Sequence, residues 1–231
     1  MWQLVEILVN GLVTLVAAFA GAWYAFRLTD RERERQTARE QVAAVNRAQF
    51  VLIQQLNALK LIQGQTINPV REHPDRFIAM RPSLSVGGPS PRLDPDSLSF
   101  LLETDDRELP FRILVEQQRF DTAVQALNER SRLHLHVLQP RLAAAGIREG
   151  GEYLRTELVG ALGDDLALPL QRATDDAIEH VDKTIESCSA LVATVYQAMK
   201  ARFPGHRFIR LDPNEPSNTP LQPPSGASAA R

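Results

Sequence analysis

The sequence predicts an all-α protein: one N-terminal membrane-spanning helix that continues into a cytoplasmic three- or four-helix bundle with an irregular proline-rich insertion. Two observations favour this fold. Residues 7–26 form a stretch of twenty residues without a charged side chain. Three later segments repeat apolar residues at alternating spacings of three and four, as packed helices do. A length of 231 residues leaves room for one domain with tails.

Residues 1–28 are predicted to form the membrane anchor. As a helix, the uncharged stretch 7–26 is about 30 Å long, which matches the hydrocarbon thickness of a bilayer. Only Glu6 is charged before it, whereas five arginines follow within residues 27–39. This asymmetry argues against a cleaved signal peptide. It predicts a single-pass protein of the inner cell membrane, with the N-terminus outside and the C-terminal domain in the cytoplasm.

One face of the predicted anchor combines hydrogen-bonding and small side chains at spacings of four, three and four. These residues are Asn10, Thr14, Ala17 and Gly21. Helices in lipid associate through such faces, so we expect contact with a second copy of the chain or with another membrane protein. The alternative is that small residues are simply common in spanning helices.

Residues 29–66 are predicted to be a stalk and the first bundle helix. Acidic and basic side chains alternate after residue 28, and neither Pro nor Gly occurs from there to Gly64, so the helix should continue. The acids nearly cancel the arginines, which favours a solvated stalk over a site for anionic lipid. The apolar seam of this helix consists of Ala38, Val42, Val45, Gln49, Leu52, Leu56 and Leu59.

Residues 67–93 are predicted to be an irregular loop. Six prolines and a Gly-Gly pair lie between residues 67 and 95, which excludes regular helix over most of the stretch. Apolar residues in the loop indicate that part of it packs down and meets a cytoplasmic partner, although disorder is the alternative. The partner-facing residues are expected to be Phe77, Ile78, Met80 and Leu84.

Residues 94–203 are predicted to supply the rest of the bundle. Asp94 and Pro95 predict a short helix that covers one end of the bundle. Another helix should begin near Asp106 and be kinked or ended by Pro140. Its seam consists of Ile113, Gln117, Phe120, Val124, Leu127, Ser131, His134 and Leu138.

After a short helix over residues 153–162, a long helix should begin at Asp164 or Asp165. It has the clearest periodicity in the chain. Its seam consists of Ile178, Val181, Ile185, Cys188, Val192, Val195 and Met199. Residues 204–231 contain six prolines among small polar residues and are predicted to be a disordered tail.

No catalytic or cofactor-binding motif is found in the sequence. GxxxxGK[ST], GxGxxG, HExxH, GxSxG and SxxK are all missing. We therefore expect no catalytic residues, no cofactor and no metal, and a pI near 6.2 argues against nucleic acid as a partner. His134 is expected to be a core histidine, with a buried titrating switch as the alternative. Cys188 belongs to an apolar seam and is expected to be a small core residue.

An acidic patch on the last helix resembles a ligand set in composition. It comprises Asp175, Asp176, Glu179, His180, Asp182 and Glu186. The sequence offers no carboxylate–histidine pair on a second helix that could complete a metal site, so we expect this patch to be a solvated face.

The function expected from these observations is a non-enzymatic, membrane-anchored interaction module: a scaffold, regulatory subunit or assembly factor. Its partners would be the lipid bilayer and a second copy or another membrane protein. One alternative is a signal transducer in which the continuous helix couples membrane packing to the bundle. Another is a membrane-associated enzyme, or a defence or toxin effector, without a recognisable motif.

Overall fold

The computed structural model describes residues 2–83, 92–147, 151 and 153–210, apart from the side chains of 3–14, 16, 17 and 164. This part of the chain is all-helical and contains no strand. In chain order the elements are α1 (Trp2–Ile62), the π-helix η1 (Gln63–Ile67), the 3₁₀-helix η2 (Asn68–Val70), α2 (Arg76–Ala79), the 3₁₀-helix η3 (Pro95–Glu103), α3 (Leu109–Leu133), the π-helix η4 (His134–Leu138), α4 (Gln139–Ala144), α5 (Arg155–Leu162) and α6 (Asp164–Arg202).

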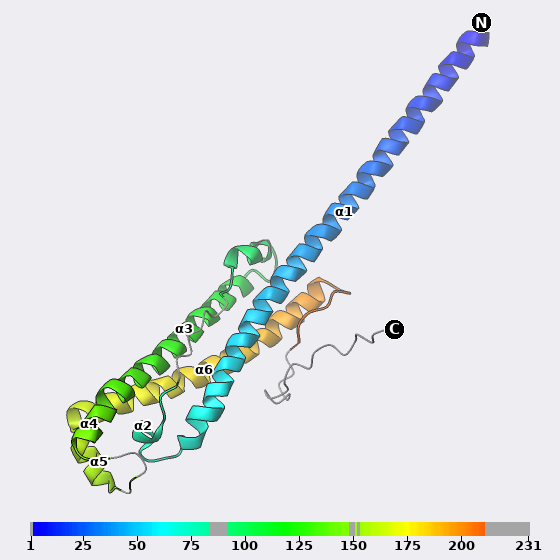
Figure 1. Ribbon diagram of the computed structural model, residues 1–231. Helices are drawn as coiled ribbons and strands as arrows, with labels where there is room; N and C mark the ends of the chain where they lie inside the picture. Colours follow the sequence, from blue (N-terminus) through cyan, green and yellow to red (C-terminus); the bar gives the residue numbers. More distant parts are fainter. Residues whose placement is uncertain (1, 84–91, 148–150, 152, 211–231) are drawn as a thin grey trace, which may run out of the picture.

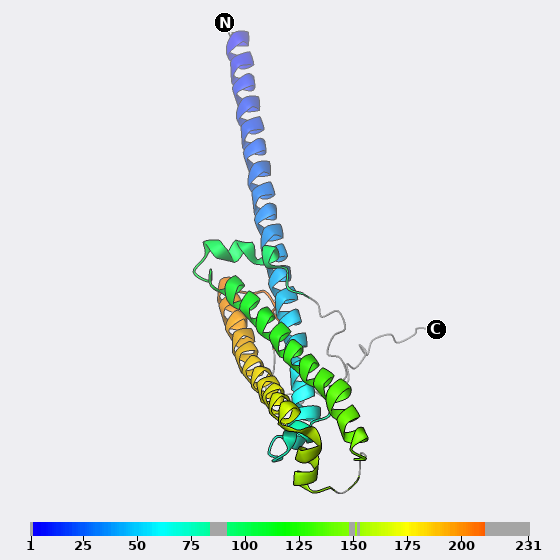
Figure 2. The same cartoon turned by 90° about the vertical axis from the view of Figure 1, so that its left-hand side faces the viewer.

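Three long helices, α1, α3 and α6, form a bundle (Figures 1 and 2). Only the C-terminal half of the 61-residue α1 belongs to it. The N-terminal half extends far beyond the other helices, and we call residues 2–28 the arm. The predicted continuation of the first helix into the bundle is confirmed, since α1 has no break before Ile62.

The three predicted seams form the core. Leu52, Leu56 and Leu59 of α1 are fully buried, as are Leu127 of α3 and Val181 of α6. Two polar side chains, Gln55 and Gln117, are buried as a hydrogen-bonded pair across α1 and α3, 2.8 Å apart. Gln49 is also fully buried, but its amide group has no hydrogen-bond partner among the described residues.

The segment η3 covers one end of the bundle, as predicted, and this is the end nearest the arm (Figures 1 and 2). Asp94 caps it, because its side chain accepts a hydrogen bond from the Asp96 amide at 3.2 Å. Leu98 and Leu101 are buried against residues of α1, α3 and α6. The segment is a 3₁₀-helix, whose three-residue turn leaves Leu102 on the outside, 56% exposed.

At the opposite end of the bundle the α-helix is interrupted just before Pro140, where the sequence predicts a kink or an end. Pro140 lacks an N–H, and its ring would clash with the carbonyl four residues earlier. The helix relaxes into the π-helix η4 directly before this residue and then continues as α4. A third apolar cluster fills this end, built from Phe77, Leu138, Leu162, Leu166, Ala167 and Leu170.

Residues 204–210 differ from the expected disordered tail, because they pack along α1. Asn46 holds them from both sides: its side chain donates to the Arg207 carbonyl and accepts from the Ile209 amide, each at 3.2 Å. Phe208 packs against the core cluster beside Phe203. Residues 211–231 of the predicted tail lie outside the described residues.

In the part of the chain that the structure describes, no helix is both long and apolar enough to cross a bilayer. Ten residues of the uncharged stretch, namely 7–14, 16 and 17, have side chains outside that part. The predicted membrane-spanning segment therefore stays a prediction.

Candidate functional site

The predicted contact face of the anchor is described only at its last residue. The backbones of Asn10, Thr14 and Ala17 belong to α1, but their side chains lie outside the described part of the structure. Gly21 is exposed, and no atom comes within 4 Å of the position that a Cβ would occupy there. A larger side chain at Gly21 would therefore meet no obstacle within the described part of this chain.

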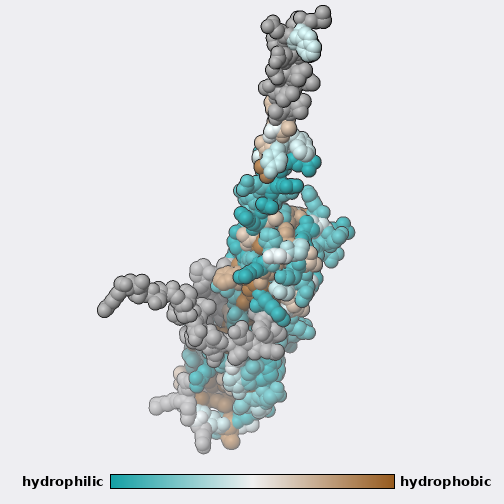
Figure 3. Space-filling view, turned by 90° about the vertical axis from the view of Figure 1, so that its right-hand side faces the viewer, coloured by the Kyte–Doolittle hydropathy of each residue, from teal (hydrophilic) through white to brown (hydrophobic). Residues whose placement is uncertain are grey.

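The described side chains of the arm are exposed, and apart from Arg27 they are uncharged and mostly apolar. Leu15 is 61% exposed and Phe19 is 76% exposed. Trp23, Tyr24 and Phe26 are exposed to a similar extent, and Arg27 lies over the Trp23 ring at 4.6 Å from its centroid. Hydrophilic side chains gather on α1 directly after these residues (Figure 3). The arm thus combines an uncovered apolar surface with an abrupt change to charge.

The loop residues expected to face a partner are mostly inside the bundle. Phe77 is 5% exposed and Met80 is 1% exposed, so the expectation that they present themselves to a partner is wrong for this conformation. Ile78 is half-buried against the third cluster, and Leu84 lies outside the described residues. The first part of the loop instead belongs to the core, because its apolar side chains gain more by covering the helix ends than by facing water.

The packed part of the loop is held by Arg130 of α3, which is fully buried. Its Nη2 donates to the carbonyls of Phe77, at 3.2 Å, and of Met80, and it lies 3.2 Å from Nδ1 of His134. In the described part of the chain Nε and Nη1 are buried without a partner, and no carboxylate pairs with the guanidinium. Burial lowers its pKa to about 10. A buried cation without a counter-charge among the described residues is costly, because its desolvation is not offset by an ion pair.

His134 lies one turn after Arg130 and is 9% exposed. A guanidinium has only donors, so Nδ1 of His134 must accept, and the ring proton is then on Nε2. Burial, and secondly the charge of Arg130, lower the pKa of His134 to about 4. His134 is therefore a neutral core residue near pH 7, and it also lines an open pocket of about 820 Å³ at this end of the bundle.

Sequence reasoning misses Arg130, although a signal for it exists. Ala123, Leu127, Arg130 and His134 follow one another at spacings of four, three and four, and all four are buried. An arginine at such a spacing is ordinarily placed on the solvated face because of its charge. The periodicity is the better guide here.

Two acids of the patch on α6 bind the loop. Arg71 forms a bidentate pair with Asp182, at 2.7 and 2.9 Å, and Gln63 donates to the same carboxylate at 2.7 Å. Arg76 pairs with Asp175 at 2.9 Å. The patch is thus partly an internal docking surface, which differs from the expected fully solvated face. In the described residues no group of three or more His, Cys, Asp and Glu side chains is arranged to hold a metal ion.

Replacing Arg71 and Asp182 separately and together, as R71A and D182A, is expected to give a coupling free energy of about 1 kcal/mol at pH 7. The pair is half-buried and bidentate, so it should lie at the upper end of the range for exposed pairs. Arg71 holds the pKa of Asp182 below its ordinary value of 3.8, so this stability is present above that value and is lost as the pH falls through the lowered pKa. Urea denaturation of the four proteins measures the coupling, and additive effects of the two substitutions would contradict it.

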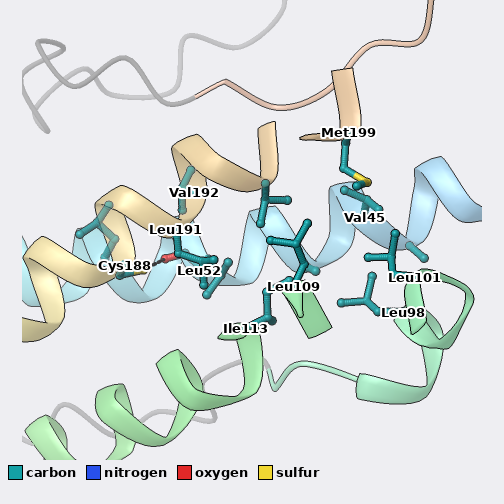
Figure 4. Packing of buried hydrophobic residues seen from close by; sticks show 14 residues of the cluster. Val45, Leu52, Leu98, Leu101, Leu109, Ile113, Cys188, Leu191, Val192 and Met199 are labelled. Atoms are coloured by element: carbon teal, nitrogen blue, oxygen red, sulfur yellow. Dashed lines mark hydrogen bonds between the residues drawn. The ribbon is translucent and has the colours of Figure 1, made fainter. Parts of the chain in front are cut away.

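Cys188 is a buried core residue beside Leu52, whose carbonyl accepts from its thiol at 3.6 Å (Figure 4). Burial, and secondly the charge of Glu116, raise the pKa of this thiol to about 12, so the reactive thiolate is strongly disfavoured. Glu116 is itself nearly buried and accepts hydrogen bonds from Arg119 at 2.7 Å and Ser187 at 2.8 Å. Its carboxylate is therefore used to join α3 to α6.

No family model, curated protein or solved structure matches this chain.

Proposed function

We propose that this chain is a non-enzymatic interaction module anchored in the inner cell membrane, with its N-terminus outside and the bundle in the cytoplasm. Residues 7–26 would span the bilayer, and the face with Asn10 and Gly21 would contact a second copy or another membrane protein. The exposed apolar surface of the arm is the observation that carries the proposal. A monomeric protein in water rarely leaves such a surface uncovered.

Several features of the arm suit a bilayer better than a protein groove. The uncharged stretch has the length of a spanning helix, about 30 Å. Trp23 and Tyr24 lie at its end, where rings of this kind favour the headgroup zone. Arg27 lies against Trp23, and the arginines of the stalk follow on the side expected to be cytoplasmic.

A polar Asn inside lipid favours association of helices. Each interhelical hydrogen bond in a membrane contributes roughly 1 kcal/mol, so a helix with Asn10 and Thr14 on one face gains by finding a neighbour. Gly21 on the same face would let two backbones approach closely.

The anchor is tested by the substitution L15R in the full-length chain, with F50R as its matched control. Both replace an exposed apolar residue of α1 by arginine, but Phe50 lies in the bundle and is 51% exposed. An arginine near the bilayer centre costs about 3 kcal/mol on insertion scales. We expect L15R to lower the fraction that resists alkaline extraction from membranes at least fivefold and F50R to leave it unchanged. Equal behaviour of the two variants, or extraction of the wild type, contradicts the anchor.

The contact face is tested by crosslinking in membranes. N10L and G21L should each reduce the yield of the crosslinked species several-fold, because one removes the hydrogen bond and the other fills the close contact. L12I serves as the control, since residue 12 lies about 200° around the helix from Asn10 and so on the opposite side of the anchor. Its crosslinking should equal that of the wild type. If crosslinking is unchanged in N10L and G21L, the proposed contact face is wrong and the arm serves only as an anchor.

The continuous α1 also favours a second candidate function, signal transduction from membrane to bundle. No break interrupts the helix between the arm and the core, so a shift or rotation of the arm would reach the bundle directly. Four glycines inserted after Glu34 should uncouple the two without removing the anchor. If reconstitution into membranes changes the amide exchange of the bundle in the wild type but not in the insertion variant, transduction is supported. If the amide exchange of the two proteins is identical, the arm serves only as a tether.

A further inference from the structure

The pocket beside His134 lies at the end of the bundle formed by α2, α4 and α5, opposite the arm (Figure 1). Its volume is about 820 Å³, in the range of small-molecule sites. One part of the lining is polar, with Arg81, His134 and Gln139. Another part is apolar and includes Leu142 and Leu158. The lining therefore offers both donors and an apolar wall to one ligand.

The charge balance around this pocket is uneven. Three aspartates at this end of the bundle each have an arginine partner: Asp75 with Arg155, Asp165 with Arg141, and Asp175 with Arg76. Arg81 has no ion pair within the described part of the chain, and the buried Arg130 has none either. The described lining residues include no acid. Two cations close to one pocket are thus without a counter-charge among the described residues.

His134 connects these cations to the pocket. Its Nδ1 is occupied by Arg130, so Nε2–H is the remaining donor of a side chain that lines the pocket. No bond to Nε2 is formed by the residues that the structure describes. Arg130 donates to Nδ1 and thereby polarises the ring, which strengthens the Nε2–H donor. A hydrogen bond from this donor to an anion is also charge-assisted, because the acceptor is ionised.

We propose that this pocket binds a small organic anion, a carboxylate or phosphate monoester with a short apolar tail, whose acidic head contacts His134 Nε2–H and Arg81. The tail would lie on the apolar wall with Leu142 and Leu158. Arg130 acts through His134 and supplies the positive field that the head neutralises. The binding of an anion gives a physical reason for a buried arginine that has no carboxylate partner in the described part of the chain.

The position of the pocket along α1 indicates where its ligand comes from, and this step rests on the proposed anchor. The chemical class of the ligand, in contrast, does not depend on the anchor. Ile62 lies 36 residues after Phe26, or about 54 Å along α1. A bilayer that holds the arm therefore cannot deliver the headgroup of an embedded lipid to this end of the bundle. The ligand is accordingly a water-soluble anion.

The test uses full-length protein in nanodiscs of zwitterionic lipid, with empty nanodiscs as the blank, and titration followed by ligand-observed NMR. Hexanoate and hexyl phosphate are expected to bind. Hexanol and hexylamine, which keep the tail without the negative head, should bind at least tenfold more weakly. Inorganic phosphate, the head without the tail, should also be at least tenfold weaker. Equal binding of hexanol, or of inorganic phosphate, overturns the assignment of the ligand class.

Two variants with matched controls locate the site. R81Q removes one cation, and A143E adds an acid to an exposed position in the lining. Each should weaken hexanoate binding at least tenfold. R132Q and A145E make the same changes of charge at positions outside the pocket lining and should bind as the wild type does. Unchanged binding in R81Q and A143E, or no binding of either anion to the wild type, overturns the proposal. Alkaline extraction of the wild type from membranes, with anion binding intact, overturns only the anchor.

Discussion

The substitution V181D is expected to unfold the bundle at room temperature or to reduce its free energy of unfolding by several kcal/mol. Val181 is fully buried in the middle of α6, in the apolar cluster that joins α6 to α1 and α3. A carboxylate at this position has no cation or donor to replace its water, and a buried unpaired charge is among the costliest single changes known. A domain of this size is stable by only about 5–15 kcal/mol.

Urea denaturation followed by circular dichroism measures this effect, with A193D as the matched control. Ala193 lies on the exposed face of the same helix, so aspartate there changes helix propensity and charge without burial. Its cost should stay below about 1 kcal/mol. A midpoint for V181D close to that of A193D would mean that α6 does not pack through this seam.

Acidification from pH 7.5 to pH 5 is expected to destabilise the wild type by about 2 kcal/mol through His134 alone. Its pKa is about 4 in the folded protein, because of burial and secondly the charge of Arg130, against 6.5 in an unfolded chain. As the pH falls below 6.5, His134 binds a proton in the unfolded state but stays neutral in the folded state. The stability due to the neutral ring is complete above about pH 6.5 and declines until the pH reaches the folded pKa, for a total of roughly 3 kcal/mol.

The matched pair H134Q and H136Q isolates this contribution. Glutamine at residue 134 can still accept from Arg130 and has no titrating ring, so H134Q should lose about 2 kcal/mol less than the wild type between pH 7.5 and pH 5. His136 is exposed on the other side of η4, and H136Q should retain the wild-type pH dependence. If H134Q and the wild type respond identically to pH, His134 is not buried beside Arg130 as described.

The seams of the bundle could be predicted from sequence because helical periodicity is a local property. Leu52, Val181 and Leu127 lie inside because each lies on an apolar stripe of its own helix, whatever the partner. The cap at Asp94 and the interruption of the α-helix before Pro140 are equally local, since each depends on backbone groups within a few residues. The same local reasoning predicted the long continuous α1.

Which apolar side chains are buried in the loop 67–93 could not be predicted from local sequence. Its prolines correctly exclude regular helix over most of its described residues, but they do not tell which way its apolar side chains face. Phe77 and Met80 are buried because each packs into an apolar cluster built from other segments, and Arg130 binds the carbonyls of both. That arginine comes from a distant segment, since 50 residues separate Met80 from Arg130.

The sequence by itself determined the helical class, the positions of the long helices, their buried faces and their caps, because these follow from spacing and from backbone chemistry within one or two turns. Only the tertiary structure decided which charges are paired. Asp182 binds Arg71, whereas Arg130 is buried without an acid among the described residues and leaves its charge facing His134 and the pocket beyond. The energy of a charge depends on the partners and the water that surround it, and those are set by segments that meet only when the chain has folded.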